Sequence, residues 1–201
     1  MALGSLVSIA ASTFNRVMVV ELSLLQIIPG LLLALHYFIQ ISRPNWGFLS
    51  DKGGNRTFWI IIGVIILCLG SILACIGILL IPENYLFGLT ISIFAYILIG
   101  IGVGASGTSL LAFLATRTDN NKKAAAATIT WIMMIFGAAF TAIFVGKIID
   151  PYTIEKLLKI VTLISLFWII ISFLTLYKLE STFKPKINNH LEPVEVTFFQ
   201  G

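Results

Sequence analysis

The sequence predicts an all-α integral membrane protein with six transmembrane helices. Three observations favour this class: composition, hydropathy and the spacing of long apolar segments. Hydrophobic residues make up 58% of the 201 residues and charged residues 11%, whereas soluble domains carry about 25% charged residues. The mean hydropathy is +1.01. Because so little polar surface is available, we expect a lipid membrane around the protein. The net charge of +4 therefore does not indicate nucleic-acid binding.

The predicted helices follow from the apolar segments, since a helix needs about 20 mostly apolar residues to cross a bilayer. The opening segment is the weakest, because it carries Asn15, Arg16 and Glu21. It has no basic residue ahead of its apolar stretch, as a signal peptide would, so we interpret it as a membrane helix. The predicted spans are 1–22, 26–42, 58–81, 86–115, 125–146 and 157–177.

The basic residues predict an orientation. If all six segments span, one side of the membrane receives most of them, and the positive-inside rule places that side in the cytoplasm. Both termini are then cytoplasmic, and 178–201 is a cytoplasmic tail or a linker to a second half. The opposite side has Lys147, Lys156 and Lys159. The predicted cytoplasmic residues are Arg43, Lys52, Arg56, Arg117, Lys122, Lys123, Lys178, Lys184 and Lys186.

Glycines cluster in GIGVGASG at 100–107. The spacing is close to a dinucleotide fingerprint, but that fingerprint lies between a strand and a helix, and this one lies inside an apolar segment. Gly100 and Gly104 have the small-xxx-small spacing that lets membrane helices approach closely, and Gly137 lies on the next segment. We expect these glycines to serve helix packing, with lining of a substrate path as the alternative.

Four polar residues within the apolar segments are candidates for a ligand site or cavity. A charge inside a bilayer is costly unless it is paired or hydrated, which singles out Arg16 and Glu21. His36 and Gln40 are four residues apart and share one helix face. A neutral imidazole can coordinate a metal, including the magnesium of a chlorin pigment, and the alternative is a hydrogen bond to another helix.

The two cysteines give no sign of a disulfide or a metal site. Cys68 and Cys75 lie in one apolar segment, where a helix separates them by about 10 Å, beyond the roughly 7 Å that a disulfide allows. There is no CxxC or Cys/His cluster. We therefore expect no metal site, and we expect apolar thiols.

A polar island, GFLSDKGGNR at 47–56, separates the second and third predicted spans. Glycines permit a tight turn between antiparallel helices. Asp51 can accept hydrogen bonds from amides at a helix N-terminus, where the helix dipole favours an anion. We expect this motif in a cytoplasmic loop, and its residues are Gly47, Leu49, Asp51, Lys52, Gly54 and Arg56.

This island resembles the loop signature G-x-L-a-D-r-x-G-r-r of the major facilitator superfamily. Further segments, FNRVMVVEL (14–22), LLALHYFIQISRPNWGFLSD (32–51) and GGNRTFWIIIG (53–63), are similar to the PucC-like, or bacteriochlorophyll-delivery, branch of that superfamily. The resemblance implies one six-helix half, 1–177, of a twelve-helix bundle. It also implies a role in (bacterio)chlorophyll delivery or light-harvesting complex assembly.

The resemblance carries expectations about ligands and partners. The expected ligand is a chlorophyll-type pigment, and no cofactor is required. The expected partners are light-harvesting proteins, together with either a missing C-terminal half or further copies of this chain. Residues 86–115 contain no Lys, Arg, Asp or Glu, and residues 125–146 contain no proline. Both observations argue against a drug/proton antiporter. The alternatives are a transporter of another small solute and a membrane assembly factor that transports nothing. We see no nucleophile–base pair or phosphate loop, and expect no enzyme.

Overall fold

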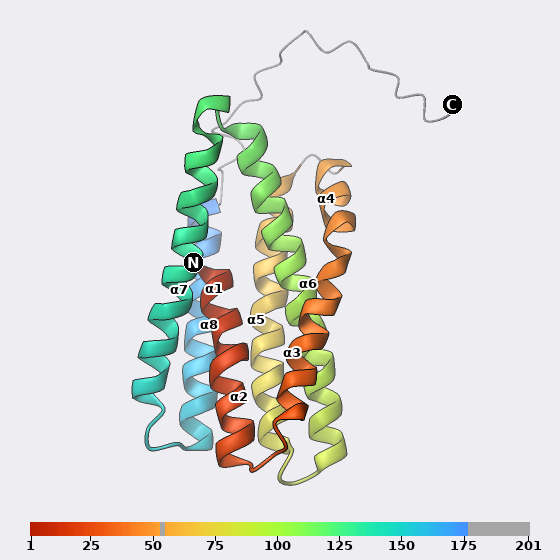
Figure 1. Cartoon of the computed structure of the whole chain (residues 1–201), viewed down its shortest axis with the longest axis vertical. Coiled ribbons are helices and arrows are strands. Elements are labelled where there is room, and N and C mark those ends of the chain that lie inside the picture. Colours follow the sequence, from red (N-terminus) through yellow and green to blue (C-terminus); the bar gives the residue numbers. More distant parts are fainter. Residues whose placement is uncertain (53–54, 177–201) are drawn as a thin grey trace, which may run out of the picture.

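The computed structural model describes residues 1–52 and 55–176, without the side chains of residues 51 and 52. The helices lie side by side in one bundle (Figure 1). The opening helix, Ala2–Glu21, is continuous but contains two π-helical segments. The elements are α1 (Ala2–Ser8), η1 (Ile9–Thr13), α2 (Phe14–Arg16), η2 (Val17–Glu21), α3 (Ile27–Ile39), η3 (Gln40–Ser42), α4 (Arg43–Lys52), α5 (Arg56–Leu80), α6 (Tyr85–Arg117), η4 (Asn120–Lys122), α7 (Lys123–Ile148) and α8 (Ile154–Leu176).

Five helices in the described part of the chain are long and apolar enough to cross a membrane. They confirm an all-helical protein of membrane type, and their ends lie within five residues of the predicted ones. The five are Ala2–Glu21, Arg56–Leu80, Tyr85–Arg117, Asn120–Ile148 and Ile154–Leu176. The predicted span 26–42 is not among them. Its apolar helix α3 has 13 residues, and the sixth span stays a prediction.

The polar island is largely helical, which corrects the predicted loop. The helix of α3 continues through the η3 turn into α4, so Gly47 and Leu49 lie on a helix. Pro44 lies in the first turn of α4, where the missing N–H of proline costs little. Gly54 and the predicted tail at 178–201 lie outside the described residues.

The most extensive contact between two helices is that of α5 with α6. We call their contact the glycine seam, formed by Gly63, Gly70 and Gly77 of α5 with Gly88 and Gly102 of α6. A methyl group at Gly63 would lie 2.5 Å from the backbone nitrogen of Ser106, and one at Gly102 would lie 2.6 Å from that of Leu67. Such distances leave no room for a side chain, so the two backbones touch directly.

The remaining helices pack around this pair. Helix α3 lies against α6 at Gly100, where a methyl group would be 2.8 Å from the carbonyl oxygen of His36. Helix α8 packs on α5, and α7 packs mainly on α1. Gly137 of α7 is close to α1, since a methyl group there would be 2.7 Å from the carbonyl oxygen of Met1. At Gly104 the nearest atom is 3.4 Å away, on Trp46, which is ordinary contact.

The core joins the opening helix to α5, α6 and α8. Its fully buried side chains include Phe14, Leu67, Tyr96 and Leu157. The hydroxyl of Tyr96 donates a hydrogen bond of 3.0 Å to the carbonyl oxygen of Ala10 in η1. A buried hydroxyl needs such a partner, and this one ties α6 to a π-helical segment.

Basic residues gather at one end of the bundle. The end of α4, the start of α5, the end of α6 and the start of α7 lie together at the top of Figure 1, and the turns after η2, α5 and α7 lie at the bottom. Arg56, Arg117, Lys122 and Lys123 are at the upper end. The side of the membrane that this end faces stays a prediction.

The glycine seam predicts the effect of a single added methyl group. We expect Gly63→Ala to lower the free energy of unfolding by about 1–3 kcal/mol, the cost of overpacking, because the α5 and α6 backbones must separate. The measurement is unfolding of the purified protein in mild micelles titrated with a denaturing detergent. Gly146→Ala is the control, since a methyl group there meets nothing within 4 Å. Equal stability of the two variants would contradict the seam.

Candidate functional site

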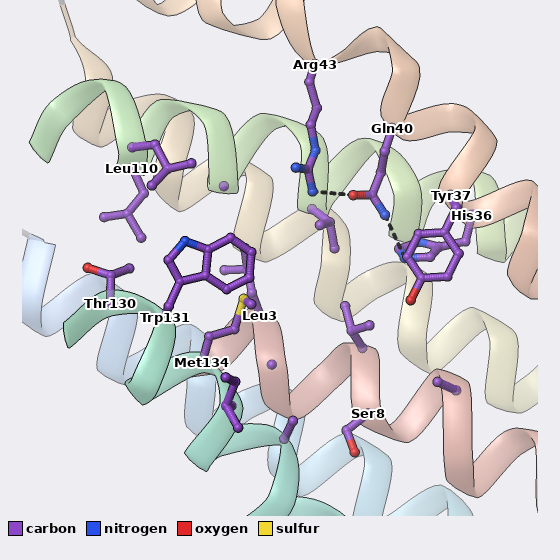
Figure 2. A pocket seen from close by; sticks show the side chains of 18 residues that line it. Leu3, Ser8, His36, Tyr37, Gln40, Arg43, Leu110, Thr130, Trp131 and Met134 are labelled. Carbon is purple, nitrogen blue, oxygen red and sulfur yellow. Dashed lines mark hydrogen bonds between the residues drawn. The ribbon is translucent and has the colours of Figure 1, made fainter. Parts of the chain in front are cut away.

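A cavity of about 510 Å³ lies between α1, α3, α6 and α7. Figure 2 shows it from close by, with the side chains of α7 on one side and those of α3 on the other. Ligand sites commonly enclose about 300–1,000 Å³. The volume is therefore that of a site for one organic molecule.

Most of the lining is apolar. Leu110 and Leu111 of α6 and Met134 and Ile135 of α7 contribute aliphatic surface. The indole of Trp131, also on α7, presents a broad aromatic surface to the cavity (Figure 2). Flat, polarisable side chains of this kind suit the face of a conjugated ring. The cavity is thus suited to a planar, largely apolar ligand.

The polar lining is concentrated on one helical stripe. His36, Gln40 and Arg43 follow one another at spacings of four and three residues and are joined by hydrogen bonds (Figure 2). An Nη–H of Arg43 donates to Oε1 of Gln40. Since a guanidinium can only donate, this contact fixes the orientation of the amide. Nε2 of Gln40 then donates to Nε2 of His36 over 2.8 Å.

This chain of hydrogen bonds determines the tautomer of His36. Its Nε2 accepts, so a neutral ring carries its proton on Nδ1. The Nδ1 atom is buried without a hydrogen-bond partner among the described residues, in a side chain that is 1% exposed. The ring therefore offers a donor, and its accepting lone pair is already engaged. Coordination of a metal by Nε2 would first require Gln40 to move away.

The predicted candidates Arg16 and Glu21 do not line this cavity. Arg16 forms an ion pair of 2.7 Å with Asp150, which follows α7, near the lower end of the bundle in Figure 1. Both side chains are well exposed, so the pair connects the opening helix to the turn before α8 at the surface. Nearby, burial is the largest of the effects that raise the pKa of the Tyr152 hydroxyl.

The polar island lies away from the cavity and connects helices. Arg56, the first residue of α5, donates to the carbonyl oxygen of Ala112 at 2.8 Å and to the hydroxyl of Thr116, both on α6. At Gly47, a methyl group would lie 3.3 Å from the side chain of Thr108, so α4 runs close to α6. The side chains of Asp51 and Lys52 lie outside the described part of the chain.

Sequence reasoning found His36 and Gln40 but missed Arg43 and Trp131. Arg43 was assigned to the cytoplasmic charge count, although positions 36, 40 and 43 form a helical i, i+4, i+7 pattern. That pattern was a usable signal once the helix was known to continue past residue 42. Trp131 carries no comparable signal, because an aromatic residue in an apolar helix is as often turned toward lipid.

The fold and the cavity define a class: a multi-pass helical protein of membrane type with an apolar, donor-edged ligand cavity. The family model described as "PUCC protein" matches residues 13–197. The match covers most of the chain, and the chain therefore belongs to the PUCC protein family. Within 1–52 and 55–176, no group of three or more His, Cys, Asp or Glu residues is placed to hold a metal ion.

Curated relatives agree with this family. "Bacteriochlorophyll synthase 44.5 kDa chain" of Rhodobacter capsulatus is 51% identical over 180 residues, which are 90% of this chain and 42% of the relative. "Protein PucC" of Cereibacter sphaeroides is 24% identical over 194 residues, 89% of this chain and 42% of the relative. The chain thus spans about two fifths of the length of these relatives. No solved structure matches it, and its place as half of a twelve-helix bundle stays a prediction.

The hydrogen-bonded stripe predicts a spectroscopic result. In protein labelled with ¹⁵N-histidine, we expect His36 to be neutral, with Nδ1 protonated and Nε2 unprotonated. Gln40→Leu should shift proton occupancy toward Nε2, because the donor to that atom is lost. Gln26→Leu, before α3, is the control that should leave the ring unchanged. His190, outside the described residues, is identified with His190→Gln. Protonation of Nε2 in the unaltered protein would contradict the assigned network.

Proposed function

We propose that this chain binds a bacteriochlorophyll-type pigment within the membrane and serves its delivery to light-harvesting proteins. The observation that carries the proposal is membership of the PUCC family together with 51% identity to a protein named for bacteriochlorophyll synthesis. The apolar cavity supports it, because a pigment macrocycle is planar, conjugated and poorly soluble in water.

The individual side chains suit such a ligand. Trp131 and Met134 supply surface for the face of a macrocycle, and the stripe of His36, Gln40 and Arg43 lies at its edge. Peripheral carbonyl oxygens of the pigment would accept hydrogen bonds from that stripe. In this arrangement the central magnesium of the pigment is not bound by Nε2 of His36, which already accepts a hydrogen bond from Gln40.

We propose a binding role for the cavity, and not catalysis, although the printed name of the first relative contains the word synthase. The described lining holds one charged residue and no carboxylate or cysteine. Such a lining can hold and orient a ligand, but it brings no pair of groups into position to move protons between substrate and enzyme. Delivery also suits a site built between helices of membrane type.

Filling the cavity should weaken pigment binding. Ala138 lines the cavity, while its neighbour Ala139 does not and is exposed. We expect Ala138→Phe to weaken binding of bacteriochlorophyll by about tenfold or more, since overpacking costs about 1–3 kcal/mol. Ala139→Phe is the matched control and should bind as the unaltered protein does. The measurement is the change in pigment absorption on titration into nanodiscs that contain the purified chain.

Delivery is then tested by mixing pigment-loaded nanodiscs with pigment-free light-harvesting polypeptides and following the absorption of the assembled complex. Transfer that is faster than from nanodiscs that carry the same pigment but lack the chain supports the proposal. Binding without acceleration would indicate an assembly role that moves no pigment. Equal pigment uptake by nanodiscs with and without the chain would overturn the proposal and favour a different solute.

A further inference from the structure

The charge in the cavity limits which form of pigment can bind there. Among the described lining residues, Arg43 alone carries a charge. Its guanidinium has five N–H donors, and one of them is engaged by Gln40. No described carboxylate forms an ion pair with Arg43. The cavity thus combines an apolar interior with a cation whose remaining donors are available at its edge.

The other polar atoms on this edge reinforce the preference. The amide of Gln40 receives the Arg43 donor and gives its own to His36, so Gln40 holds the guanidinium in place. The Nδ1 atom of His36 is buried, in a side chain that is 1% exposed, so the donors at this edge come from Arg43 and its neighbour Gln40. A cation with several remaining donors favours a ligand whose edge carries acceptor oxygens and a negative charge.

We propose that the cavity takes the free-acid form of a tetrapyrrole, with its ionised carboxylate beside Arg43, in preference to the esterified pigment. This inference rests on the proposed function and names the substrate class of the same site. An arginine and a carboxylate match in charge and in planar geometry. Esterification removes the charge, so the guanidinium is left with an uncharged carbonyl acceptor, which it binds less strongly than a carboxylate.

The stem of Arg43 packs against α6. Its Cγ atom passes 3.8 Å from the position that a methyl group would take at Gly104 of α6. Trp131 of α7 lies across the cavity from Arg43 (Figure 2). A macrocycle resting on Trp131 would direct its acidic edge toward Arg43.

The experiment compares a bacteriochlorophyllide with its methyl ester, which differ in charge but share the ring. Each is titrated into phosphatidylcholine nanodiscs containing the purified chain, and pigment absorption is followed. We expect the acid to bind about tenfold more tightly, as for a hydrogen bond to a charged group. Arg43→Met should lower the affinity for the acid to that for the ester. Lys123→Met, at an exposed position outside the cavity, should preserve the difference.

One further arm makes the result decisive. Oleate tests whether any membrane carboxylate suffices, and displacement of the acid at equal concentration would overturn selection of the macrocycle. Equal, tight binding of acid and ester would overturn this inference and leave the proposed function standing. Binding of neither would overturn the proposed function itself.

Discussion

Direct backbone contact between α5 and α6 is the constraint on which the other helices depend. In a membrane, helices gain little from burying apolar side chains against one another, because lipid is equally apolar. Close approach at small residues is the available alternative, and the glycine seam provides it from Gly63 to Gly77 of α5. The outer face of α6 then receives α3 at Gly100, and α5 receives α8 and the opening helix.

The cavity exists because this tight packing stops on one side of the bundle. Helix α7 is held mainly by α1, through the contacts of Gly4 and Gly137 and a hydrogen bond of 2.7 Å between the hydroxyls of Ser5 and Thr141. Helix α3 is held by α6. The two helices therefore lie on opposite walls, and the space between them is lined by long side chains such as Trp131 and Arg43. The positions of the small residues therefore determine both where the helices pack closely and where the cavity lies.

The sequence was sufficient for the helices and for part of the site. Apolar runs located the five long helices, and the spacing of His36 and Gln40 placed them on one face. The extension of the second helix to Lys52 was missed, because the polar residues and glycines of 47–56 were interpreted as a loop between helices. The partner of Arg16 could not be found, since Asp150 is 134 residues away. The seven-residue spacing of Gly63, Gly70 and Gly77 was visible but not used.

Attachment of α7 along essentially one neighbour has a mechanical consequence. A ligand lying between Trp131 and Arg43 would contact both walls of the cavity and so connect α7 to α4 through contacts that the ligand-free protein lacks. Ligand binding of this kind stabilises the folded state in proportion to the logarithm of its concentration. Loading would therefore stiffen the bundle on the side where its own packing is thinnest, and release of the ligand would let α7 move again relative to α3. The bound ligand and the neighbouring helix α1 would then both hold α7 in place.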